Sequence, residues 1–296
     1  MPLLDPGSPS GSSTSSKRTA YFTIEPAETK DARRLVDIEF QAFENERANQ
    51  QLSFRDYTKP AHFKRSVDLY TTALKQINPN APPTKRPRRA AGPVSRTSFL
   101  KITDSETGEI VSFAKTELKA YSLAELHQPL DIGHEGEPCM NRDWFGLNER
   151  LRREYMGLRK HCCKFAGADG CDRYIDPGVD IGMLATQPCH QNEGAGSMLL
   201  DAVLTEADNL GIEVYLEGTD TARPLYEKFG FVAVKEIRFN PADYGLRDVP
   251  RERQTVMVRG ALDVGGVRQP VDDWEASVAQ AEADVLGAQA ALGLAL

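Results

Sequence analysis

The sequence predicts an α/β fold in which a mixed central sheet is flanked by helices. Two regions support this prediction. Residues 96–103 and 109–118 are strand-like runs on either side of the turn sequence DSETGE, which indicates an antiparallel hairpin. Residues 179–217 follow the order strand, glycine-rich loop, helix and strand, which is typical of a right-handed crossover between parallel strands. A sheet with both connections is mixed.

The N-terminal half is predicted to hold one strand and two helices before the hairpin. The strand covers 21–27 (YFTIEPA), and the first helix covers 31–43, with mostly apolar residues on one face. The second helix covers 61–76 and ends at the proline-containing sequence NPNAPP. After the hairpin we expect an insert at 119–178, with a charged helix at 148–164.

The C-terminal half alternates strands with helices. A buried strand at 179–186 is followed by a helix at 197–209, which Gly211 ends because glycine is favoured just beyond a helix. The remaining predicted elements are a strand at 212–216, a helix at 223–229, and strands at 231–238 and 253–259.

The extension at 261–296 is predicted to contain one more helix. Apolar residues recur there at alternating spacings of four and three: Trp274, Val278, Ala281, Val285, Ala288 and Leu292. Such a stripe buries one helix face. We therefore expect this helix to dock on the domain or to form a homodimer with a second copy of the chain.

Composition excludes several functional classes. The chain has 296 residues, 40% of them hydrophobic, and a net charge of −7, which argues against general nucleic-acid binding. It contains no apolar run long enough for a membrane span. Residues 1–20 are rich in Ser, Gly and Pro and lack a signal-peptide pattern, so they predict a disordered tail of a cytoplasmic protein. The basic run at 85–89 is interpreted as a linker, with a nuclear signal as the alternative.

The cysteines do not form a convincing metal site. Cys139, Cys162, Cys163, Cys171 and Cys189 are interpreted as reduced thiols. The stretch HCCKFAGADGC is the one zinc candidate, but adjacent cysteines point apart on regular structure and no second ligand pair completes four ligands. We predict no metal.

The sequence PCHQNEGAG, residues 188–196, stands directly before a predicted helix. Backbone N–H groups at a helix start lack intrahelical partners and bind anions, and glycines leave them uncovered. A nucleoside-triphosphate loop is excluded because no lysine follows Gly196. A dinucleotide loop would use Glu217 for the ribose, but Leu199 occupies its third glycine position.

QNEGAG resembles the Q/R-x-x-G-x-G/A loop of the GCN5-related N-acetyltransferase (GNAT) family. The resemblance extends over LATQPCHQNEGAGSMLL and LEGTDTARPLYEKFGF, and is nearest to fungal-type members. It implies a GNAT-like domain at 21–260, with 119–178 as a variable insert before the strand that binds coenzyme A. The acetyl-CoA-binding residues that it implies are Leu184, Ala185, Thr186, Gln191, Asn192, Glu193, Gly194, Ala195, Gly196, Ser197 and Thr219.

The same resemblance implies two catalytic residues. Tyr226 falls where the family places a tyrosine that protonates the departing thiolate. Asp180 lies eleven residues before Gln191, where lysine acetyltransferases of the family carry a glutamate. Its side chain is one carbon shorter, so we expect it to act as a base through water, with Glu217 as the alternative base.

The resulting expectation is acetyl transfer from acetyl-CoA to the amine of a small molecule. Two alternatives remain: a protein lysine or N-terminal acetyltransferase, and a CoA-binding module without turnover. We expect the acceptor site between the two N-terminal helices and the insert, where Trp144, Phe145 and Tyr155 could form its walls.

Overall fold

The structure is a computed structural model that describes residues 21–46, 48, 52–53, 59–77, 95–119, 121–129, 138–157 and 178–292. Three predictions lie outside the described residues: the tail at 1–20, the basic run at 85–89, and the cysteines at 162, 163 and 171.

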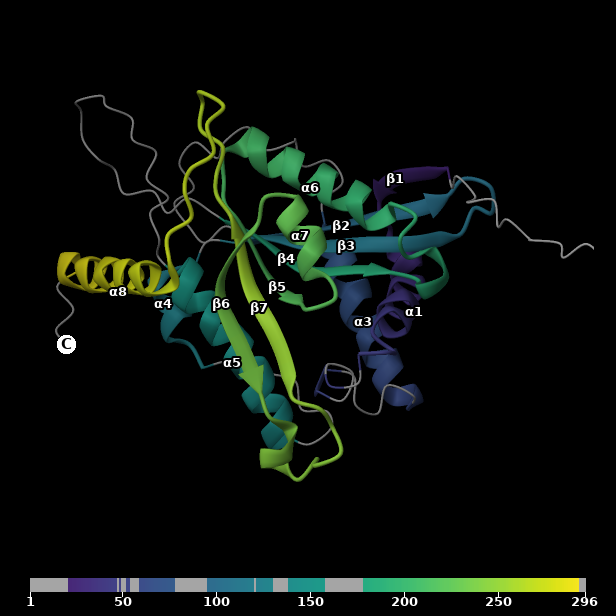
Figure 1. Cartoon of the computed structure of the whole chain (residues 1–296), viewed down its shortest axis with the longest axis horizontal. Helices are drawn as coiled ribbons and strands as arrows, with labels where there is room; N and C mark the ends of the chain where they lie inside the picture. The colour runs from purple at the N-terminus through teal and green to yellow at the C-terminus, as the bar shows by residue number, and fades with distance from the viewer. Residues whose placement is uncertain are drawn as a thin grey trace, which may run out of the picture.

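The described residues form one seven-stranded sheet with the order β1-β2-β3-β4-β5-β7-β6 (Figure 1). Strands β4 and β5 pair in parallel, and all other neighbours pair antiparallel. The strands are β1 (Phe22–Pro26), β2 (Ser95–Asp104), β3 (Ile110–Lys119), β4 (Gly178–Thr186), β5 (Val214–Thr219), β6 (Val232–Phe239) and β7 (Glu252–Arg259). This confirms the predicted mixed α/β fold.

Helices flank the sheet on both faces. They are α1 (Ala32–Ala42), α3 (Pro60–Gln76), α4 (Leu123–His127), α5 (Pro138–Met156), α6 (Ala195–Leu210), α7 (Arg223–Lys228) and α8 (Trp274–Ala291). Two predicted boundaries were wrong. Helix α5 begins at Pro138, not at 148, because its polar first turns are held by burial of Met140 and Trp144 against Phe239. Strand β5 extends to Thr219, since its pairing with β7 continues to Gln254.

The two faces of the sheet have separate cores. Helices α6 and α7 cover one face, where residues such as Leu199 pack against Val111 and Val214. Helices α1 and α3 cover the opposite face over β2, β3 and the end of β4. Helices α5 and α8 cover that same opposite face over β5, β7 and β6. Figure 1 shows the resulting layers, with α6 on one side and α1, α3 and α5 on the other.

A β-bulge interrupts β4 at Gly182. Ile181 is paired with Thr116 and Met183 with Lys115, so Gly182 has no partner on β3. Because of this extra residue, side chains of β4 two residues apart across the bulge point to opposite faces of the sheet. Residues before it, such as Ile181, pack under α6, whereas Met183 and Ala185 after it pack against α1 and α3.

Strands β4 and β5 separate soon after they begin. Their paired positions are Val179 with Val214 and Asp180 with Tyr215. Beyond Asp180, no described strand pairs with the β5-facing edge of β4. The backbone of β4 from Ile181 onward therefore presents an open edge toward β5 (Figure 1).

Helix α8 docks through its first half. Asp273 caps it by accepting a hydrogen bond from the Ala276 amide at 2.8 Å. Trp274 and Ala281 of the predicted stripe are buried on α5, but Leu292 is 67% exposed. The stripe is thus most deeply buried at its N-terminal end and exposed at Leu292.

Candidate functional site

The glycine-rich loop opens α6 with a set of amides that have no intrahelical acceptor. Met198 donates the first hydrogen bond of the helix, to the Gly194 carbonyl at 3.0 Å. The amides of Ala195, Gly196 and Ser197 precede it. Gly194 adopts φ 100°, a conformation that side chains rarely tolerate. This geometry is that of an anion-binding helix start.

Hydrogen bonds tie this loop to the end of β4. Gln191 Nε2 donates to the Thr186 carbonyl at 3.2 Å, and the Thr186 and Ser112 hydroxyls are 2.7 Å apart. Asn192 and Glu193 are exposed on the loop, and the Glu193 carboxylate lies 2.9 Å from His190 Nδ1. The loop is therefore anchored at its base while its outer side chains face solvent.

Gly196 is the point where the loop, β4 and α7 meet. A β-carbon on Gly196 would lie 3.8 Å from both Thr186 Oγ1 and Leu225 Cδ2. The predicted pantetheine-binding residues, Leu184, Ala185 and Thr186, lie beside it on the open edge of β4. The structure thus brings the predicted loop and strand residues together.

Tyr226 lies on α7, buried between β5 and Phe231, whose ring centroid is 5.8 Å from its own. Burial raises the pKa of Tyr226 well above its usual range, and the charge of Glu46 raises it further. The phenol consequently stays protonated at neutral pH.

Thr219, at the end of β5, donates a hydrogen bond from Oγ1 to Glu46 Oε1 at 3.2 Å. Glu46 follows α1, far away in sequence. Sequence reasoning missed it because the surrounding ENERANQ has no motif. Only the contact with Thr219 and its effect on Tyr226 identify Glu46 as part of this site.

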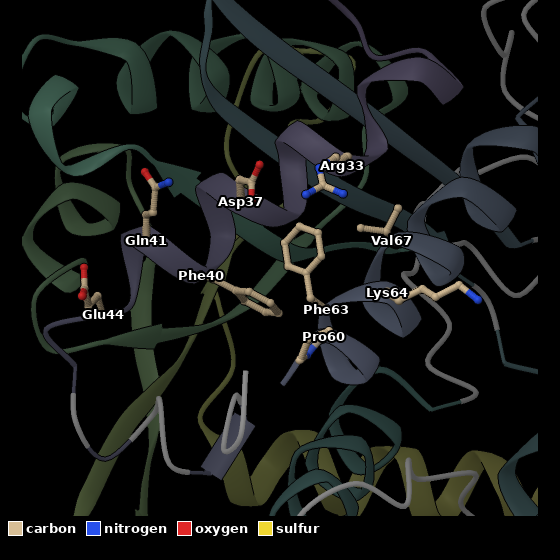
Figure 2. A pocket seen from close by; sticks show the side chains of 9 residues that line it. All are labelled: Arg33, Asp37, Phe40, Gln41, Glu44, Pro60, Phe63, Lys64 and Val67. Carbon is tan, nitrogen blue, oxygen red and sulfur yellow. The ribbon is translucent and has the colours of Figure 1, made fainter. Parts of the chain in front are cut away.

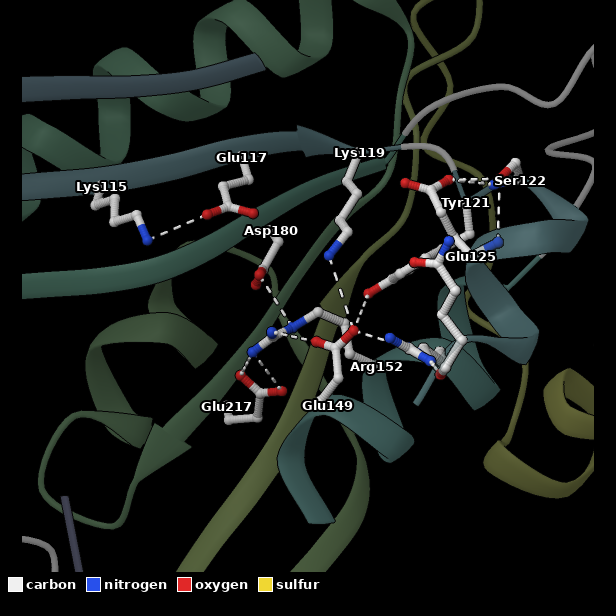
Figure 3. A network of polar contacts seen from close by, with 12 residues as sticks. Lys115, Glu117, Lys119, Tyr121, Ser122, Glu125, Glu149, Arg152, Asp180 and Glu217 are labelled. Atoms are coloured by element: carbon white, nitrogen blue, oxygen red, sulfur yellow. Dashed lines mark hydrogen bonds and ion pairs between the residues drawn. The ribbon is translucent and has the colours of Figure 1, made fainter. Parts of the chain in front are cut away.

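Asp180 belongs to a buried ionic network (Figure 3). Its Oδ2 is 3.0 Å from Arg152 Nε of α5, and Arg152 Nη2 is 3.1 Å from Glu217 Oε2. Burial raises the pKa of Asp180 to about 7; Arg152 opposes this rise and Glu217 adds to it. Asp180 Oδ1 is buried without a hydrogen-bond partner among the described residues. Arg152 was also missed, because a single arginine in a charged helix carries no sequence signal.

Two other buried carboxyl groups, one near Glu46 and one between α1 and α3, also have raised pKa values. Burial raises the pKa of Glu252 on β7 to about 7, with a contribution from Glu46. Burial also raises the pKa of Glu39 on α1 to about 7, although the Tyr70 hydroxyl donates to its carboxylate. Burial makes these carboxyl groups costly to ionise, so a positively charged group that approached them would favour their ionised form.

An open pocket of about 780 Å³ lies between α1 and α3 (Figure 2). Phe40 and Phe63 form its apolar wall, with their ring centroids 5.8 Å apart. None of the predicted site residues lines it. This pocket therefore lies apart from the residues predicted to bind acetyl-CoA.

Two of the three aromatic residues suggested as walls of the acceptor site fill cores instead, and the third, Phe145, is partly buried beside Trp144. Trp144 is buried against Phe239, and Tyr155 is buried between Tyr215 and Trp274. Among the described residues no group of three or more His, Cys, Asp or Glu side chains is arranged to hold a metal ion. In that same part of the chain, no helix is long and apolar enough to cross a bilayer.

A mixed sheet that splits between two parallel strands, beside a helix start that can bind an anion, can hold an extended ligand that carries phosphate. The family model described as acetyltransferase (GNAT) domain matches residues 164–250. Residues 164–250 therefore match a GNAT acetyltransferase domain, and acetyl-CoA-dependent N-acetyl transfer is the activity that this match supports.

Solved structures with a similar fold are distant in sequence. The C-terminal condensation domain of Ebony, in complex with beta-alanyl-dopamine, is 12% identical with a TM-score of 0.50, covering 81% of this chain and 99% of that one. An HPA2-type histone acetyltransferase and related acetyltransferase from Corynebacterium glutamicum is 19% identical with a TM-score of 0.43, covering 80% and 94%. A mosquito arylalkylamine N-acetyltransferase like 5b is 12% identical with a TM-score of 0.49, covering 81% and 99%. No curated protein matches the sequence.

Proposed function

We propose that the protein transfers the acetyl group of acetyl-CoA directly to the amine of a small molecule. One observation carries this proposal: carboxyl groups gather on the face of β5 that holds Thr219. Glu217 and Thr219 are two residues apart on that face, Glu46 accepts from Thr219, and Glu252 is close enough to Glu46 for their charges to interact. Such a surface attracts a protonated amine and offers acceptors for its proton.

Acetyl-CoA would lie along the open edge of β4. The amides from Gln191 to Ser197 would bind the pyrophosphate, and the backbone from Leu184 to Thr186 would pair with the pantetheine arm like an added strand. This arrangement directs the thioester toward the Gly218–Thr219 end of β5, where Tyr226 packs.

In the transfer, the amine nitrogen attacks the acetyl carbonyl carbon and the carbon–sulfur bond breaks. Tyr226 gives its proton to the departing thiolate. A carboxylate takes the proton from the amine. Asp180 can do this through a water molecule, because Arg152 occupies only one of its two oxygens. Glu46 is the second candidate, since it lies beside Thr219.

We also propose four further properties of the protein that the sequence predicts. They are a fungal-type affiliation, a cytoplasmic location, an absence of nucleic-acid partners, and a homodimer formed through α8. A protein lysine or N-terminal acetyltransferase would use the same chemistry on a peptide amine.

Thiol release from acetyl-CoA tests the proposal directly. We expect turnover with small primary amines and none with lysine-containing or N-terminal peptides. Turnover with peptides alone would show that the acceptor is a peptide amine and not a small molecule. Turnover with neither would favour a CoA-binding module without catalysis. Asp180→Asn and Glu46→Gln should separate the two candidate bases, because loss of the true base lowers kcat/KM by about 10²–10⁴-fold. Glu227→Gln, which removes only an exposed partner of Arg223, is the control.

A further inference from the structure

Arg152 connects β4 and β5 at the point where the strands separate. Asp180 is the last residue of β4 that pairs with β5, and its partner there is Tyr215. Glu217 lies two residues beyond Tyr215 on β5. The Arg152 guanidinium forms an ion pair with Asp180, with Nε 3.0 Å from Oδ2, and donates hydrogen bonds from Nη2 to Glu217 at 3.1 and 3.3 Å. Figure 3 shows this single side chain reaching from α5 to both strands. It links the two strands through side chains at the last position where their backbones pair.

The guanidinium also balances the charge at the base of the split. Without it, two carboxylates would face each other in a buried region and repel. The other titratable and charged groups that face Asp180 or Arg152 come from β3, the segment after β3, α5 and β5: Lys115, Glu117, Lys119, Tyr121, Glu149 and Tyr215. The two lysines are engaged elsewhere, since Lys115 pairs with Glu117 at 3.1 Å and Lys119 lies 3.9 Å from Glu149. Arg152 is therefore the cation that compensates Asp180 and Glu217 together.

Contacts among three buried aromatic rings hold α5 in this position. Tyr155, three residues after Arg152, lies with its ring centroid 5.7 Å from that of Tyr215 on β5 and 5.6 Å from that of Trp274 on α8. Lys235 Nζ lies 4.2 Å from the centroid of the Trp274 ring. The C-terminal helix thus presses the Arg152 turn of α5 against β5.

We propose that Arg152 is a positioning residue for acetyl transfer, which holds the base of the split between β4 and β5 and supplies the positive charge beside Asp180 and Glu217, and that α8 holds Arg152 in place through Tyr155. The role given to Asp180 rests on the proposed function. The bridge between the strands does not depend on it.

The pH dependence of kcat/KM for the amine tests this proposal. At low pH, kcat/KM should fall as Asp180 becomes protonated, and this fall is the acid limb of the profile. Arg152→Met should move the acid limb to higher pH by about one unit or more, because Asp180 then ionises beside an uncompensated Glu217. Glu217→Gln should move the limb to lower pH, since it removes the repulsion and leaves Arg152 in place. Arg152→Lys should restore part of the wild-type profile. Acid limbs that are unchanged in both Arg152→Met and Glu217→Gln would overturn the proposal.

Arg153→Met is the matched control. Arg153 is the next residue on α5, but it pairs with Glu149 at 2.9 Å and with the Gln128 carbonyl at 2.8 Å. Its loss should leave the acid limb in place. A limb that moves equally in Arg153→Met would mean that general loss of positive charge, not the bridge, is responsible.

Titration of the Asp180 carboxyl carbon by NMR separates this proposal from the proposed function. It needs no turnover, so it remains decisive if no amine is acetylated. We expect the Asp180 pKa to rise in Arg152→Met and to fall in Glu217→Gln. If Arg152→Met does not fold, Arg152→Lys and Glu217→Gln decide the matter, and an Asp180 titration unchanged in both would refute the bridge.

Trp274→Ala tests the part played by α8. It should shift the Asp180 titration in the same direction as Arg152→Met, by a smaller amount. Leu292→Ala, at the exposed end of the same helix, should not shift it. An unshifted titration in a folded Trp274→Ala protein would exclude α8 from the arrangement.

Discussion

Tyr226 packs directly on Gly218: a β-carbon on Gly218 would lie 3.0 Å from Tyr226 Cε2 and 3.1 Å from Cδ2. Gly218→Ala should therefore push the tyrosine ring out of place, with a cost of about 1–3 kcal/mol for overpacking. We expect a lower melting temperature and a lower kcat. Gly287→Ala, on α8, is the control, because no atom lies within 4 Å of its added β-carbon. Full activity in Gly218→Ala would show that the ring position does not matter.

Tyr226→Phe should lower kcat by about ten-fold or more, since general acids contribute about 10²–10⁴-fold. The KM for acetyl-CoA should change little. Burial raises the pKa of Tyr226, so the wild-type phenol should not cause a loss of activity up to about pH 10. Equal kcat values for both proteins would reduce Tyr226 to a packing residue.

Gly194→Asp should abolish acetyl-CoA binding in a folded protein. No atom lies within 4 Å of its added β-carbon, so the effect would come from the charge beside the pyrophosphate and from the left-handed backbone. Gly194→Asn carries the same shape without the charge and should bind more tightly than Gly194→Asp. Gly196→Asp should abolish binding as well. Calorimetry would contradict the predicted loop function if both aspartate variants bound acetyl-CoA normally.

Asp208, in the last turn of α6, should make the free energy of unfolding decrease as the pH becomes acidic. Burial tends to raise its pKa, but hydrogen bonds from Arg259 and Arg268 outweigh it and lower the pKa to about 2. A depressed pKa stabilises the fold above the unfolded value near pH 4, and this stabilisation is lost as pH falls toward 2. We expect Asp208→Asn to cost about 1–2 kcal/mol at pH 7, after allowance for solvent screening, and roughly half as much at pH 3.

Urea unfolding at several pH values measures this difference. Asp220→Asn is the control, because its pair with Arg253 is exposed and should contribute little. A difference between wild type and Asp208→Asn that stays constant from pH 7 to pH 3 would contradict the linkage.

A chain that ends at Gly265 should keep acetyl-CoA binding but melt at a lower temperature. It loses α8 with the buried Trp274, and it loses Arg268, which binds Asp208 at 3.0 Å. About 3 kcal/mol for the tryptophan alone corresponds to roughly 6–12 °C. Light scattering of the full and shortened chains would reveal whether α8 also joins two copies. Unchanged melting and mass together would mean that α8 contributes nothing to the fold.

The C-terminal half could be predicted closely because its signals are local. The glycine loop, Gly211 and the LYEKFGF turn each act within a few residues, and the predicted helix and strand types agree with the structure there. The predicted order of strand, loop, helix and strand also placed the glycine loop at the end of β4, where the structure has it.

Arg152 and Glu46 could not be predicted, because each reaches its partners through tertiary packing. Arg152 stands in a helix whose first turns lack apolar periodicity, and its pairing with Asp180 depends on how α5 crosses the sheet. Glu46 meets Thr219 only because α1 ends beside β5. Single charged residues in such segments resemble ordinary surface charges until the fold places them.

The open edge of β4 makes the co-substrate part of the sheet's stability. If acetyl-CoA supplies the missing hydrogen bonds, amides from Ile181 to Thr186 that face β5 should exchange with solvent in the free protein and become protected on binding. Because only the folded chain has this edge, ligand at 100 times its Kd would add about 2.7 kcal/mol to the unfolding free energy. Mutations far from the site that loosen β4 or β5 should then be rescued by acetyl-CoA, and the cellular level of the co-substrate would set how much folded protein is present.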